Sequence, residues 1–168
     1  TKPDELRFDL ENCDVSLANS LRRIMISETP TIAFDTIDYE ISSLKVITNT
    51  GALHNEMLLH RLGMIPINVS DPLMFDPTDY KFVIEVQNTG NTILDVTSKD
   101  FRVIDNKTNR DMDVNDFFPP NPVTKDHILI TRLKPNPGGG EGEKIHIEGT
   151  ARIGIGKENS RWSPCSCV

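Results

Sequence analysis

Four residues in two distant parts of the chain resemble the ligand and proton-transfer set of a zinc-dependent deaminase. His54 and Glu56 have the H-x-E spacing, and Cys165 and Cys167 follow a proline much later in the chain. In zinc deaminases one His and two Cys hold the metal, while the Glu moves protons. Here one residue separates the cysteines where the pattern needs two. Capping or packing roles for the His and incidental thiols are the simpler interpretation, and a zinc-dependent hydrolase stays an alternative.

A phosphate-binding loop is a second candidate that the spacing weakens. The chain contains Gly154, Gly156 and Lys157 in close succession. A P-loop requires a glycine five residues before its Gly-Lys pair and a hydroxyl residue after it. The chain has Ala151 and Glu158 at those positions. The sequence therefore predicts no catalytic residue, no cofactor and no metal site.

Composition limits the possible partners. The 168 residues carry a formal net charge of −7, which argues against bulk phosphate binding and against a direct sequence-specific DNA contact. Three cysteines without an apolar signal sequence favour a reducing, intracellular compartment. No run of about 18 apolar residues is present, so we expect no membrane span.

The residues whose pattern indicates a partner-binding surface lie on a predicted helix that begins after Asp14. At about 100° per residue, its apolar residues fall within one arc. The helix should end near Ser27 to Thr29, because Pro30 disfavours a helical conformation for the residue before it. Arg22 and Arg23 are adjacent within this helix and point in different directions. The apolar stripe consists of Leu17, Leu21, Ile24 and Met25.

Two strands, a second helix and a returning strand should support this helix. Alternation of apolar and polar residues predicts strands over 5–10, 29–41 and 144–155. A helix is expected between Gly51 and Gly63, largely buried because its apolar residues surround it.

The block over residues 68–143 has a different composition, with most of the prolines and several short strand candidates. The strand candidates are 80–86, 92–97, 101–104 and 127–133, and a flexible connector over 135–144 follows them. We therefore predict an α+β fold. A discontinuous domain over 1–67 and 144–168, an antiparallel sheet plus two helices, would carry an inserted mostly β domain over 68–143.

The run ANSLRRIMISE over 18–28, the strand after it and HRLGMIP over 60–66 resemble the dimerisation domain of the alpha-like RNA polymerase subunits. The similarity is greatest to the larger alpha-like subunit of archaeal and eukaryotic-type enzymes, with a viral enzyme also possible, and it extends to the N-terminal domain of the bacterial alpha subunit. ILDVTSKDF over 93–101 and GIGKENSRWSP over 154–164 resemble further parts of the family. The insert lacks the cysteine cluster of some relatives, and the C-terminal part of the dimerisation domain is expected to be truncated.

The resemblance implies a non-catalytic assembly subunit of DNA-dependent RNA polymerase. The apolar stripe would pair with a smaller alpha-like subunit, and the heterodimer would be a platform for the second-largest and largest subunits, together with small accessory subunits. Magnesium-dependent catalysis would then lie on the large subunits. The residues implied in large-subunit docking are Arg22, Arg23, Lys157, Glu158, Arg161 and Trp162. The location would be the nucleus in a eukaryote, or the cytoplasm or virion for an archaeal or viral enzyme. A non-polymerase protein-interaction adaptor is the remaining alternative.

Overall fold

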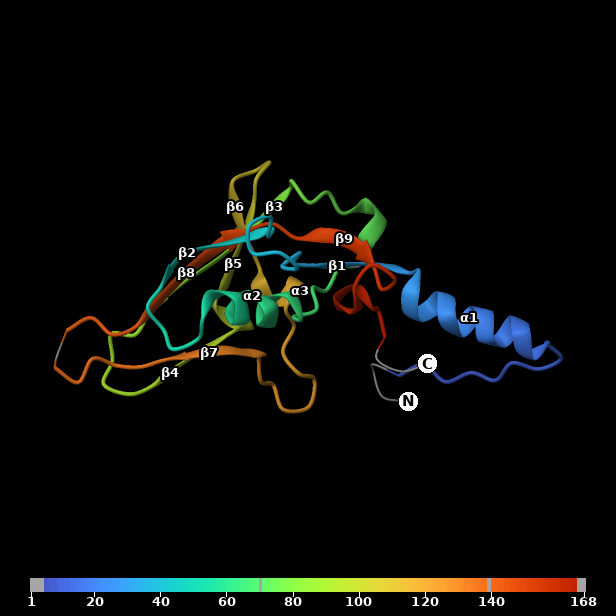
Figure 1. Ribbon diagram of the computed structural model, residues 1–168, viewed down its shortest axis with the longest axis horizontal. Coiled ribbons are helices and arrows are strands. Elements are labelled where there is room, and N and C mark those ends of the chain that lie inside the picture. Colours follow the sequence, from blue (N-terminus) through green and yellow to red (C-terminus); the bar gives the residue numbers. More distant parts are fainter. Residues whose placement is uncertain (1–4, 70, 139, 166–168) are drawn as a thin grey trace.

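An antiparallel sheet of five strands, in the order β2-β8-β3-β5-β6, is the centre of the fold. The computed structural model describes residues 5–69, 71–138 and 140–165. With its helices (Figure 1) the chain has the predicted α+β class. The strands of this sheet are β2 (Leu44–Asn49), β3 (Tyr80–Gln87), β5 (Phe101–Asp105), β6 (Arg110–Met112) and β8 (Lys144–Gly149).

Two antiparallel two-stranded ribbons flank the central sheet. One pairs β1 (Pro30–Ala33) with β9 (Arg152–Ile155), and the other pairs β4 (Leu94–Thr97) with β7 (Leu129–Leu133). The strand predicted over 144–155 is thus two strands, which join different sheets on either side of a break at Thr150 and Ala151. The chain from β8 to β9 therefore connects the central sheet to the β1–β9 ribbon, and β1 directly follows α1.

The helices are short, and three of them are single 3-10 turns. The α-helices are α1 (Val15–Ser27), α2 (Asn55–Gly63) and α3 (Val114–Phe117). The 3-10 turns are η1 (Pro72–Met74), η2 (Ser98–Asp100) and η3 (Ser160–Trp162). No helix within the described ranges has the length and apolar character needed to cross a membrane.

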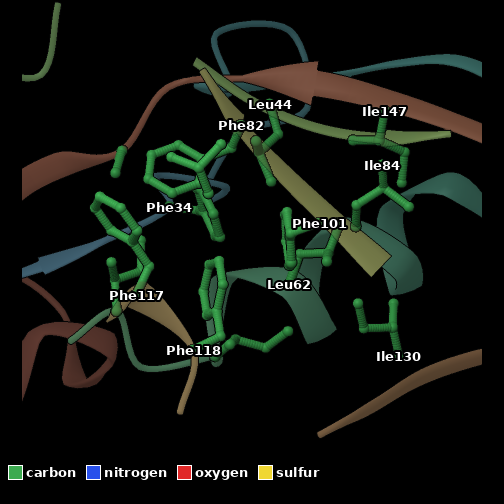
Figure 2. Close-up of a cluster of buried hydrophobic side chains, with 14 of the residues drawn as sticks. Phe34, Leu44, Leu62, Phe82, Ile84, Phe101, Phe117, Phe118, Ile130 and Ile147 are labelled. Atoms are coloured by element: carbon green, nitrogen blue, oxygen red, sulfur yellow. The ribbon is translucent and has the colours of Figure 1, made fainter. Parts of the chain in front are cut away.

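Aromatic side chains form the centre of the core (Figure 2). The Phe34 ring stands edge-on to Phe82 at 5.2 Å between centroids and is stacked with Phe101 at 5.6 Å. Phe101 also stacks on Phe118 at 4.5 Å. One side of α2 closes the core with Leu58, Leu59 and Leu62, all buried. Phe34 follows β1, so this core holds the base of α1 to the central sheet.

Three predictions about local structure were wrong. Residues 5–10 form no strand, and Leu6, Phe8 and Leu10 are exposed. The strand expected over 29–41 is limited to β1, after which the chain turns, leaving Ile37, Tyr39 and Ile41 exposed. The sequence analysis also missed β2, which begins at Leu44 after the polar residues that interrupted the pattern.

Most strands of the predicted insert are present, with changed ends. The strands β3 and β5 match their expected ranges closely, while β4 and β7 are each two residues shorter at the start. However, β3 pairs with β8, which the prediction placed outside the insert. The two predicted parts thus share one sheet and one core, and the division at residues 68 and 143 stays a prediction.

Candidate functional site

The helix α1 projects from one end of the molecule (Figure 1) and has no buried residue. It begins and ends as the sequence predicted, with the Asp14 carboxylate accepting a hydrogen bond from the backbone N–H of Ser16. Because a helix of 13 residues is only marginally stable alone in water, packing normally stabilises it. Here the described part of the chain supplies little packing, so the helix has a surface available for another molecule.

The predicted apolar stripe lies on this projecting helix and remains open to solvent. Leu17, Leu21 and Ile24 are 55%, 39% and 47% exposed, and Met25 is half-buried near the helix base. Apolar side chains gathered on one helical face mark an interaction surface more often than a solvated one. The structure therefore brings the four predicted residues together on one accessible face.

Three predicted docking residues meet in one hollow at the C-terminal end of α1. Arg22, Arg23 and Lys157 line it, with Ile24 and Glu28 among their neighbours. The backbone N–H of Lys157 donates to the carbonyl of Ser27 at 2.8 Å, so the loop after β9 abuts the helix end. We call Arg22, Arg23 and Lys157 the cationic hollow.

The cationic hollow has the chemistry to bind carboxylates or carbonyl groups. The Arg22 guanidinium is oriented by Asn19, whose side-chain oxygen accepts from it at 3.0 and 3.2 Å. Guanidinium groups bind carboxylates through two parallel hydrogen bonds and are less strongly hydrated than an ammonium. Glu28 is the one acidic residue lining the hollow.

Glu158 lies beside this hollow but is engaged elsewhere. Its carboxylate is 3.5 Å from the Arg152 guanidinium, which also forms an ion pair with Asp35 at 2.6 Å. Both Arg152 and Glu158 are about half exposed, so their pair is weak. Glu158 thus remains accessible to a partner.

Trp162, by contrast, cannot contact a neighbouring subunit in this structure, because its side chain is 0% exposed. Its indole N–H donates to the carbonyl of Arg152 at 3.2 Å, and Gly154 lies against its ring. A Cβ on Gly154 would collide with the indole, so the glycine allows the close approach. The docking role predicted for Trp162 is therefore corrected to a structural one.

Arg161 is partly buried and bonded within the chain. Its guanidinium donates to the carbonyl of Phe34 at 2.9 Å and to the Thr36 hydroxyl at 2.6 Å. Burial lowers the pKa of the Arg161 guanidinium, against a raising effect of nearby Asp35. Arg161 fixes the loop after β1, and because its side chain is only partly buried its docking role stays a prediction. Spacing alone could not distinguish this role from docking.

The residues of the zinc alternative do not assemble in the described part of the chain. His54 precedes α2 at its N-cap position, whereas the Cys165 thiol lies 3.6 Å from the carbonyl of Met25 at the base of α1. Cys167 lies outside the described residues. Within those residues no group of three His, Cys, Asp or Glu side chains is arranged to hold a metal ion.

Comparison with known proteins identifies the family. The family model described as the RNA polymerase Rpb3/Rpb11 dimerisation domain matches residues 7–116, which include α1, α2 and the first four strands of the central sheet. The chain belongs to this family. Within the Rpb3/Rpb11 family, the resemblance to the larger alpha-like subunits of archaeal and eukaryotic polymerases is confirmed.

Named relatives come from eukaryotes and archaea. The chain is 36% identical over 173 residues to "Conjugation stage-specific protein" of Tetrahymena thermophila, covering 94% of this chain and 52% of the relative. It is 31% identical over 183 residues to "DNA-directed RNA polymerases II, IV and V subunit 3" of Arabidopsis thaliana, covering 99% of this chain and 53% of the relative. It is 31% identical over 169 residues to "DNA-directed RNA polymerase subunit Rpo3" of Thermococcus kodakarensis, covering 97% and 54%. The chain spans about half the length of these curated relatives.

The sequence analysis missed a surface around α2 of this Rpb3/Rpb11 family chain. Two hollows flank the helix, and both are lined by Leu53 and Arg61. Met57, on the outward side of α2, is 61% exposed, although we expected the helix to be largely buried. The apolar residues around the whole circumference of α2 were the available signal. Apolar residues on all sides of a helix cannot all be buried when only one side of the helix packs against the core.

Proposed function

We propose that the protein is a non-catalytic assembly subunit of a multisubunit DNA-dependent RNA polymerase. The observation that carries the proposal is the projecting α1, with Leu17, Leu21 and Ile24 exposed on one face in a chain that belongs to the Rpb3/Rpb11 dimerisation family. Relatives with 31% identity are named as polymerase subunits. Family membership favours this function over a zinc-dependent hydrolase and over an adaptor outside the polymerase.

The first partner in this proposal is a smaller alpha-like subunit. Its equivalent helix packs along the stripe of Leu17, Leu21, Ile24 and Met25, and both chains gain by removing apolar surface from water. The contact stabilises α1 itself, because the helix has little packing within its own chain. Pairing and stabilisation of α1 are therefore coupled.

The large catalytic subunits are the second set of partners. We assign their docking to the cationic hollow, with Glu158 at its margin. Arg22 and Arg23 lie outside the apolar arc, so one helix can serve two partners on different sides. Carboxylates or backbone carbonyls of a large subunit fit these donors. Small accessory subunits complete the assembly.

Catalysis and DNA reading belong to other chains in this proposal. A net charge of −7 disfavours phosphate binding, and the cationic hollow is too small to track a nucleic-acid backbone. The assembly would lie in the nucleus of a eukaryote, in the cytoplasm of an archaeon, or in the cytoplasm or virion for a viral enzyme.

Affinity purification from the native source tests the proposal. The full-length tagged protein should recover a small alpha-like chain and two chains well above about 100 kDa, identified by mass spectrometry, with template-directed RNA synthesis in the eluate. Variants with Leu21→Asp should lose all of these partners, while the control Asn19→Asp, on the opposite side of α1, should keep the small alpha-like chain. Recovery of the wild-type protein without large chains would overturn the proposal.

A further inference from the structure

The surface around α2 has apolar side chains that nothing in the described chain covers. The first hollow, between α2 and the loop after β1, exposes Ile37, Tyr39 and Met57. The second, between α2 and β7, exposes Ile93 and Leu129. Single exposed apolar residues are ordinary, but a contiguous group of them marks an interaction surface. We call the two hollows together the α2 surface.

The two hollows form a single surface because they share residues. Leu53, before α2, and Arg61, in its last turn, line both of them. Met57 and Arg61 are four residues apart within α2, so they follow the same side of the helix, and Leu53 lies just before its first turn. A partner segment crossing α2 can therefore contact both hollows at once.

The α2 surface is separate from the projecting helix. In Figure 1, α2 lies near the middle of the molecule and the β4–β7 ribbon toward one end, while α1 extends from the other end. A chain bound along α1 thus leaves the α2 surface open. The contact argued here is additional to the two in the proposed function.

The charges differ between the two hollows and specify the occupant. Arg61, Arg132 and Lys134 line the second hollow, in a chain whose net charge is −7. Arg132 is paired with Asp95 at 2.9 Å, whereas neither Arg61 nor Lys134 has an ion pair among the described residues. Asp38 and Glu56 line the first hollow, together with the shared Arg61.

Arg61 has a fixed position in this arrangement. Its guanidinium donates to the carbonyls of Leu129 and Ile130 at 2.9 and 2.8 Å, which ties α2 to β7. Carbonyl acceptors orient the guanidinium without neutralising it, so its charge is available to a carboxylate. The second hollow is therefore a preorganised apolar site with a positive margin.

We propose that the α2 surface binds a polypeptide segment of another chain that combines apolar residues with carboxylates, the carboxylates lying over the second hollow beside Arg61 and Lys134. The proposal rests on the proposed function in one respect, since it places that chain in the same polymerase assembly. The apolar residues fill the hollows and the carboxylates set the direction of the segment across α2. A nucleic-acid strand fits less well, because Asp38 and Glu56 repel phosphates in the first hollow.

Site-specific photo-crosslinking in the intact assembly tests this. The full-length tagged protein carries p-benzoylphenylalanine in place of Met57 or Ile93, and crosslinked segments are sequenced by mass spectrometry. The same group in place of Leu21 reports the pairing of α1, and in place of the exposed Val123 it reports background. Both α2-surface positions should crosslink to one polypeptide segment, with Asp or Glu adjacent to the Ile93 product.

A charge reversal gives a matched control. Lys134→Glu should lower the Ile93 crosslink at least about fivefold through like-charge repulsion, while Lys99→Glu at an exposed position of η2 should leave it unchanged. Crosslinks only at the Val123 level, with the Leu21 crosslink present, would overturn the inference and leave the proposed function intact. A crosslinked nucleic acid or a lysine-rich segment would also overturn it. If Leu21 crosslinks to no alpha-like chain, the proposed function fails and the inference falls with it.

Discussion

Replacing Leu21 by aspartate should abolish pairing without unfolding the protein. No residue of α1 is buried, so the substitution removes no core contact and changes only the surface offered to a partner. Leu21 is 39% exposed, so burial of its remaining surface contributes about 0.6–1.2 kcal/mol if full burial of a leucine contributes about 1.5–3 kcal/mol. An uncompensated carboxylate at the interface costs about 3–5 kcal/mol more.

Together these terms correspond to a loss of affinity of about 10³- to 10⁴-fold, since about 1.4 kcal/mol is a factor of ten. An aspartate can turn toward solvent and recover part of this, so we expect at least about a 100-fold loss. The assay is titration calorimetry with the purified smaller alpha-like subunit, beside thermal melting of the protein alone.

Asn19→Asp is the matched control for this prediction. It adds the same charge to the same helix, nearly without a change in shape, on the side opposite the stripe. Its affinity should stay within about threefold of wild type. The reasoning is refuted if Leu21→Asp pairs within tenfold of wild type, or if Asn19→Asp loses as much affinity as Leu21→Asp does.

Three further perturbations separate docking, core and capping. Arg22→Ala with Arg23→Ala should leave the alpha-like heterodimer intact and weaken binding of the large subunits, measured by size-exclusion chromatography of reconstituted assemblies. Trp162→Ala should lower the free energy of unfolding by about 3–5 kcal/mol, because it leaves a cavity in place of a fully buried ring, measured by denaturant titration. Hydrogen bonds from the Ser16 side chain and backbone lower the pKa of the Asp14 carboxyl, so the cap stabilises α1 above the ordinary pKa of aspartate. It is lost as pH falls through the lower folded-state pKa, and the helical circular dichroism of the unpaired protein should decrease there.

Each of these has a control and a contradicting result. Normal recruitment of large subunits by the double arginine variant would remove the docking role of the cationic hollow. Unchanged stability of the Trp162→Ala variant, compared with an alanine at exposed Met74, would contradict the burial of the indole. Asp14→Asn keeps an acceptor that does not titrate in this range, so its α1 should show no such acid transition. A transition equal to that of wild type would exclude the Asp14 carboxylate as its cause.

The helix α1 could be predicted from sequence because its determinants are local. An acidic N-cap, an apolar stripe at helical spacing and Pro30, three residues after the end of the helix, lie within one short segment. The exposed side of the stripe agrees with the prediction of a surface needing a partner.

Strands whose partners are distant were harder to predict. Leu6, Phe8 and Leu10 alternate with charged residues as a strand would, but no described strand pairs with them. Conversely, the apolar residues of β2 do not alternate regularly, and its partner β8 lies about one hundred residues away in the chain. Alternation reports that a residue could face a core, and pairing decides whether it does.

The roles of Arg161 and Trp162 could not be read from their types. Trp and Arg are favoured at interfaces, but they also occur in buried positions. For Trp162, the close approach of Gly154 to the ring is what shows the buried position. Only part of the cationic hollow could be predicted from sequence. Arg22 and Arg23 are adjacent in the chain, whereas Lys157 comes close to them only because β9 pairs with β1.

The exposure of α1 has a consequence for the abundance of the protein in a cell. A copy without its partner presents an unpacked apolar helix, and such segments open locally at low free-energy cost. Chaperones and proteases act on locally opened segments, so unpaired copies should be removed faster than paired ones. If the proposed pairing holds, the amount of the protein should therefore follow the supply of that partner, which would keep the two chains in equal numbers without a dedicated regulator.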